Sequence, residues 1–165
     1  MLFTRKTTFL VTAAAMLAAL VLMLGGCSGS SSSSGSMAGE KPTIKITLPA
    51  EGAMLPPGDL TVHVQVSNFE LVDKLGETPV KGQGHIHYFL DTTPPTIQGQ
   101  PAIPKGGTFA PSTELSHTFT DVGPGQHVLA VELVQNNHTP LNPAVVDSIT
   151  VTVQPAGGMS GSTGQ

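Results

Sequence analysis

Hydrophobic and polar residues alternate with a period of two in several short runs, which is the pattern of β-strands with one buried face. Gly and Pro cluster between the runs, and no run after residue 24 shows the period of an amphipathic helix. About seven short strands with turns between them predict an all-β antiparallel sandwich. The clearest runs span residues 43–48, 60–66, 85–90, 114–120, 127–134 and 146–153, with a partial strand near 70–74.

The alternation also predicts which side chains face the core. In the first run Ile44, Ile46 and Leu48 share the inward face, and in the second run His63 points outward into solvent. The segment 92–113 is rich in Pro and Gly and too long for a turn, so we expect short edge pieces or a loop lying over a site.

The N-terminal segment has the pattern of an export signal. Arg5 and Lys6 precede an apolar run over residues 9–24, which ends in Leu-Gly-Gly-Cys at Cys27. This ending resembles the bacterial lipobox, which implies that Cys27 is lipidated; the alternative is an uncleaved transmembrane anchor. We therefore expect a signal peptide over 1–26, a Ser/Gly tether over 27–39, a domain over 40–154 and a disordered tail over 155–165.

Composition limits the possible binding partners and the cellular location of the protein. Cys27 is the sole cysteine, so the domain holds together without a disulfide. Five lysines stand against eleven acidic residues after the signal, a net charge near −6 that argues against nucleic acid. The sequence predicts a protein of the cell envelope, lipid-anchored and facing the periplasm or the exterior, whose protein or small-ligand partner the sequence does not specify.

The residues that could bind a metal lie on the strand that follows Gly84. Along this strand His85 and His87 share one face with Phe89, while Ile86 and Tyr88 take the core face. The two imidazoles then stand about 6 to 7 Å apart at their Cα atoms, close enough to converge on one metal ion.

The chain resembles immunoglobulin and fibronectin type III domains in its strand order, its 121–127 turn and its closing strand. It resembles more closely small exported domain families of unknown function, through a Gly-His-x-His strand at 84–87, Leu-Asp at 90–91, Gly-Gln-His at 125–127 and Asn-His at 137–138. The resemblance implies an immunoglobulin-like sandwich and brings no established activity.

In an immunoglobulin-like order the strand 85–90 pairs antiparallel with 127–134, and the last strand lies on the far side of 127–134. His85 and His87 would then meet Glu132 and the loop that carries His138, which predicts a Cu or Zn site. Three further residues are weaker candidates for metal ligands in this arrangement. His127 and Asp91 are expected together at the opposite end of the strand 127–134, and Asp147 is expected near the three histidines.

Two alternatives remain beside a metal-binding or interaction module. The histidines can be structural, which would make the chain a purely structural domain of the cell envelope. His85-x-His87 with Asp91 and His127 also resembles the metal motif of cupins, which implies a metal-dependent enzyme. Asp91 stands where that motif has Glu, and the spacing at His127 departs from the second cupin motif, so we expect a binding module rather than an enzyme.

Overall fold

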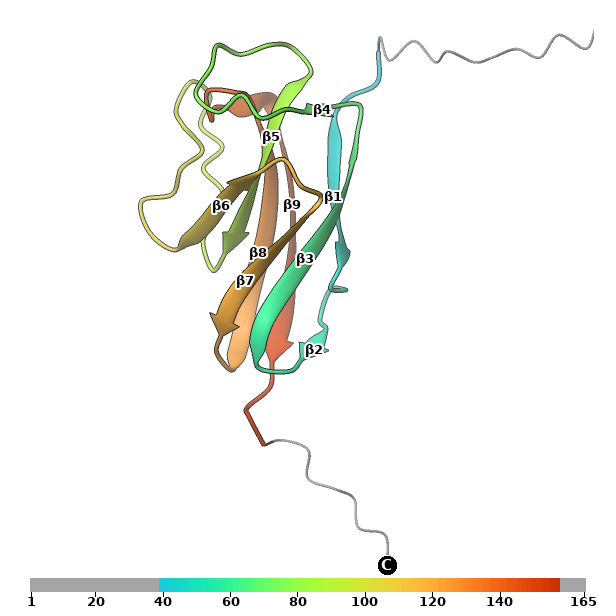
Figure 1. The fold of residues 1–165 in the computed structure, drawn as a ribbon, viewed down its shortest axis with the longest axis vertical. Coiled ribbons are helices and arrows are strands. Elements are labelled where there is room, and N and C mark those ends of the chain that lie inside the picture. The colour runs from blue at the N-terminus through green and yellow to red at the C-terminus, as the bar shows by residue number, and fades with distance from the viewer. Residues whose placement is uncertain (1–38, 158–165) are drawn as a thin grey trace, which may run out of the picture. The chain divides into compact units, whose positions relative to one another are not determined.

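A computed structural model describes residues 39–157 of the chain, which are built from strands and turns (Figure 1). The predicted signal peptide, the lipidated Cys27, most of the tether and residues 158–165 of the tail lie outside the described residues. Within residues 39–157 no helix has the length and apolar character needed to cross a membrane.

The smaller sheet has three antiparallel strands in the order β1-β3-β7. The larger sheet has the order β2-β9-β8-β5-β4, and β6 also pairs with β5. The strands are β1 (Thr43–Leu48), β2 (Met54–Leu55), β3 (Gly58–Ser67), β4 (Glu70–Leu71), β5 (Gln83–Leu90), β6 (Thr108–Ser112), β7 (Ser116–Val122), β8 (Gly125–Val134) and β9 (Pro140–Val153).

The two sheets form a sandwich with one apolar core between them. Alternate residues of β1, β3 and β7 face alternate residues of β5, β8 and β9, as the period of two requires. The antiparallel neighbours β5, β8 and β9 on one sheet and β1, β3 and β7 on the other have the arrangement of the immunoglobulin and fibronectin III sandwich. The predicted fold class is therefore confirmed.

Several details differ from the prediction. Leu48 was expected inside, but the register shifts between Ile46 and Leu48, and its side chain is 57% exposed. The last strand begins at Pro140, six residues before the predicted start. The two shortest strands pair in parallel, β2 with β9 and β4 with β5, in an otherwise antiparallel fold. His63 points outward on β3 as predicted.

Both faces of β5 are buried, so the histidines of this strand lie inside the protein rather than in solvent. Ile86 and Tyr88 belong to the core between the sheets, whereas His85, His87 and Phe89 lie on the outer face of the larger sheet and are also fully buried. The segment 92–107 covers this outer face, and β6 follows it as an edge strand along β5. The expectation of edge pieces and a covering loop in 92–113 is thus confirmed.

Candidate metal centre

Three histidine side chains converge on the outer face of the larger sheet. His85 and His87 come from β5, and His138 comes from the loop between β8 and β9. The Nε2 atoms of His85 and His87 lie 3.1 Å apart, and His138 Nδ1 lies 3.1 Å from the first and 3.0 Å from the second. One nitrogen from each ring therefore occupies a corner of a nearly equilateral triangle, which we call the histidine triangle.

Local backbone geometry delivers each ring to this point. The period of two on β5 puts His85 and His87 on the same face. The loop turns back at His138, whose φ of 65° lies in the left-handed region and whose N–H donates to the Gln135 carbonyl at 2.9 Å. Residues other than glycine are uncommon in this conformation, and histidine is among the types that adopt it more often than most.

Ala102 connects two of the three histidines through its backbone. Its carbonyl lies 2.8 Å from His87 Nδ1, and its N–H donates to the His138 carbonyl at 2.7 Å. A carbonyl can only accept, so His87 carries its proton on Nδ1 and directs the lone pair of Nε2 into the triangle. This is the arrangement in which metal-binding histidines are oriented by a backbone carbonyl.

The three imidazoles are neutral at pH 7. Burial, together with the neighbouring His87 and His138, lowers the pKa of His85 to about 3. Burial also lowers the pKa of His87 to about 4, although the hydrogen bond to Ala102 opposes this, and it lowers the pKa of His138. Neutral imidazole is the form that binds a metal.

The triangle has the dimensions of a metal site. The centre of a triangle with these sides lies about 1.8 Å from each nitrogen, whereas Zn–N bonds are about 2.0 to 2.1 Å. The spacing of the three nitrogens is therefore close to that needed for one ion, and His85, His87 and His138 would each supply one ligand to it.

Glu132 is the nearest acidic residue in the sheet register, directly across from His87. It is fully buried, and neither carboxyl oxygen has a hydrogen-bond partner among residues 39–157. Burial raises the pKa of Glu132 to about 7. Its carboxylate does not belong to the close cluster of ligand atoms formed by the three histidines. His85 Nδ1, on the same face of the sheet, is also buried without a partner in the described chain, and such groups are rare enough in proteins to require an explanation.

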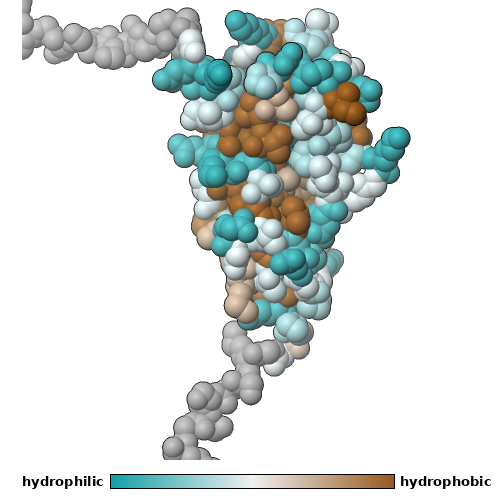
Figure 2. Space-filling model, turned by 180° about the vertical axis from the view of Figure 1, so that it is seen from behind, coloured by the Kyte–Doolittle hydropathy of each residue, from teal (hydrophilic) through white to brown (hydrophobic). Residues whose placement is uncertain are grey.

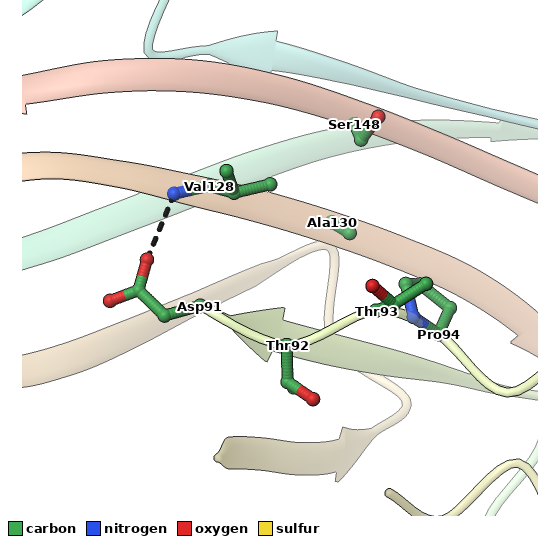
Figure 3. Close-up of a pocket in the computed structure, with 7 residues that line it drawn as sticks. All are labelled: Asp91, Thr92, Thr93, Pro94, Val128, Ala130 and Ser148. Carbon is green, nitrogen blue, oxygen red and sulfur yellow. Dashed lines mark hydrogen bonds between the residues drawn. The ribbon is translucent and has the colours of Figure 1, made fainter.

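Asp91 and His127 form a separate pair at the other end of β8, as predicted. Asp91 has a φ of 54° and lines a depression of about 380 Å³. One of its carboxyl oxygens accepts the Val128 N–H at 2.9 Å (Figure 3). His127 Nδ1 lies 2.7 Å from the other carboxyl oxygen, and Nε2 lies 2.9 Å from the Gly123 carbonyl. Both ring nitrogens meet acceptors, and the bond to Asp91 raises the pKa of His127. This pair ties the end of β5 to β8.

Asp147 also lies outside the triangle. Its carboxylate accepts the Ile46 N–H at 2.8 Å and lies 3.4 Å from Lys45 Nζ, so it links β9 to β1. The cupin arrangement is not assembled either, because His127 contacts Asp91 and Gly123 rather than the other histidines, and the fold is a two-sheet sandwich.

Sequence reasoning missed Ala102. A backbone donor and acceptor carry no side-chain signal, and the residue lies in the Pro/Gly-rich segment without a readable period. Its complete burial depends on the path of that segment over β5.

No protein-family model matches the chain, and no curated protein matches it. Three solved structures with partial likeness are an engineered protein that was a Northeast Structural Genomics Consortium target, the fibronectin(III)-like modules of CbhA from Clostridium thermocellum, and the PKD domain of human KIAA0319. Their identities are 11%, 17% and 20%, and their TM-scores 0.42, 0.42 and 0.38. The alignments cover 68%, 76% and 83% of this chain, and 20%, 53% and 100% of the other chains. The chain thus spans a fifth of the first and about half of the second.

Proposed function

We propose that this chain is a metal-binding module of the cell envelope that holds one Zn²⁺ or Cu²⁺ ion through His85, His87 and His138. The histidine triangle is the observation that carries the proposal: two buried imidazoles and one half-buried imidazole, all neutral, place one nitrogen each within 3.0 to 3.1 Å of the other two. Imidazole nitrogen suits both ions, and Cu²⁺ binds more tightly than Zn²⁺ to a given set of ligands.

Hydrogen bonding among the rings cannot satisfy all three nitrogens. His87 Nε2 carries a lone pair, because the proton of that ring is on Nδ1. A proton on one of the other two nitrogens leaves two lone pairs facing each other at 3.0 to 3.1 Å, and protons on both leave two N–H groups facing each other at 3.1 Å. A cation bound by the three nitrogens would accept all three lone pairs at once, which removes this repulsion. A dication would also stabilise the ionised form of the nearby buried Glu132.

The cellular location in this proposal rests on the sequence alone. The segment ending in Leu-Gly-Gly-Cys at Cys27, followed by Ser and Gly, supports a lipid anchor and a tether that carry the domain on a membrane surface. Binding is favoured over catalysis because His85 and His87 are fully buried and Ala102 of the covering segment lies directly on the site.

Titration calorimetry with Zn²⁺ and Cu²⁺ tests the proposal on protein without a histidine tag, after removal of bound metal with a chelator. We expect one ion per chain for the wild type. His87→Ala and His138→Ala should each weaken binding at least about 100-fold, since each removes a ligand from a preorganised set. His63→Ala is the matched control, because its imidazole points outward from β3.

Two results would overturn the metal site. One is the same affinity for His87→Ala and the wild type, and the other is no binding of either ion by the wild type. The histidines would then be structural residues that stiffen the outer face of the sheet.

A further inference from the structure

A second concave feature lies at the end of the sandwich where the described chain begins, next to the start of β1. It is a groove of about 840 Å³ between the first residues of β1, the segment 79–82 and the first half of β9. Its apolar lining includes the following six residues: Ile44, Phe69, Val80, Leu141, Val145 and Val146. Figure 2 shows apolar side chains gathered on this side of the domain, with hydrophilic residues around them.

The groove differs from the rest of the surface in its charge. Among residues 39–157, two lysines line it, Lys41 and Lys81, both exposed, and no Asp or Glu belongs to its lining. These are two of only five lysines that stand against eleven acidic residues after residue 27. Asp147, the acidic residue of β9, is already engaged by the Ile46 N–H and by Lys45. The groove is thus an apolar surface with a cationic rim on an acidic protein.

The groove is separate from the candidate metal centre. None of the three histidines lines it, and His85 and His87 lie beneath the covering segment 92–107 on the outer face of the sheet. Its volume falls within the range of small-molecule sites in proteins.

We propose that this groove binds a single-chain amphipathic anion, a long-chain carboxylate of the fatty-acid type. The alkyl chain would cover the six apolar residues, and the carboxylate would lie between Lys41 and Lys81. Burying one methylene changes affinity about fourfold, so the alkyl chain supplies most of the binding free energy. The lysines select an anionic head group over a neutral or cationic one, because no acidic residue of the lining competes for them.

The test uses the protein without its signal segment and with Cys27→Ser, so that no attached acyl chain occupies the groove. Binding of decanoate and dodecanoate, below their micelle concentrations, is measured by calorimetry, with dodecylamine and dodecanol as head-group controls. We expect dodecanoate to bind about 15-fold more tightly than decanoate, because it has two more methylenes, and both controls to bind at least tenfold more weakly than dodecanoate.

Three variants locate the site. The double variant Lys41→Glu/Lys81→Glu should weaken dodecanoate binding at least tenfold, whereas Lys105→Glu, a single charge reversal at an exposed residue outside the lining, should leave it within twofold. Val80→Asp should also abolish binding, and this side chain is 46% exposed, so the variant should still fold.

The proposal is overturned if dodecanoate does not bind, if dodecylamine binds equally well, or if the double variant behaves like Lys105→Glu. The His87→Ala variant should bind dodecanoate normally, so loss of the metal site and loss of this site are distinguishable.

Discussion

Gly84 should not tolerate even the smallest side chain, although it lies within a strand where alanine is usually acceptable. A Cβ atom at this position would lie 1.9 Å from the Val134 carbonyl oxygen, 2.9 Å from Phe69 Cζ and 3.0 Å from the Val134 carbonyl carbon. Ordinary contact begins near 3.4 Å, so the backbones of β5 and β8 would have to separate by about 1.5 Å. Two of the three clashing atoms are backbone atoms, which no change of side-chain rotamer can move.

The cost of Gly84→Ala follows from that displacement. Overpacking in a close-packed region costs about 1 to 3 kcal/mol, and each ladder hydrogen bond lost costs about 0.5 to 1.5 kcal/mol. We therefore expect the free energy of unfolding to fall by about 2 to 4 kcal/mol. His85 pairs with Val134, so the same displacement should also weaken metal binding by moving one corner of the histidine triangle.

Urea denaturation followed by circular dichroism measures this effect. Gly123→Ala is the matched control, because a Cβ there meets no atom within 4 Å and its φ is not in the left-handed region. The control should change the free energy of unfolding by less than about 0.5 kcal/mol. Equal stabilities of the Gly84→Ala and Gly123→Ala variants would refute the close approach of β5 to β8.

Three further predictions concern two titratable groups and the membrane attachment of the protein. Burial raises the pKa of Glu132 in the folded state, so the contribution of this carboxyl group to stability is complete below pH 4.5 and is lost as the pH rises through 7. Metal-free Glu132→Gln has no such loss, and its free energy of unfolding relative to that of the wild type should rise by about 3 kcal/mol between pH 4.5 and pH 8. Urea denaturation at the two pH values measures this difference. NMR titration should give His127 a pKa above that of a free imidazole, and Asp91→Asn should lower it, whereas an unchanged value would contradict the ion pair. Cys27→Ser should abolish incorporation of labelled fatty acid and reduce the membrane-bound fraction of the protein, and equal labelling of the variant would contradict the lipobox.

The regular part of the fold was predictable because one face of each strand is buried. Alternation alone placed Ile86 and Tyr88 inside and His85 and His87 on the opposite face. Alternation along β8 also puts Glu132 on the outer face, opposite to Val131 and Leu133, but its burial could not be read from the sequence of β8. The burial of Glu132 depends on the segment 92–107, which covers that face and whose sequence shows neither strand nor helix periodicity.

The candidate site was partly predictable. Strand order and register bring the loop with His138 to the start of β5, because antiparallel pairing joins His85 to Val134 just before that loop. The tautomer of His87 depends on the Ala102 carbonyl, fifteen residues away along an irregular segment. A bulge after Ile46 turned Leu48 outward, and such a one-residue shift has no reliable pattern in a single sequence.

The central claim is that the histidine triangle holds one metal ion, and anomalous diffraction from crystals of the metal-loaded protein tests it most directly. Data collected on both sides of the absorption edge of the bound metal should show one peak, about 2.0 to 2.1 Å from one nitrogen each of His85, His87 and His138. A peak on other residues, or no peak in crystals saturated with Zn²⁺ or Cu²⁺, would contradict it.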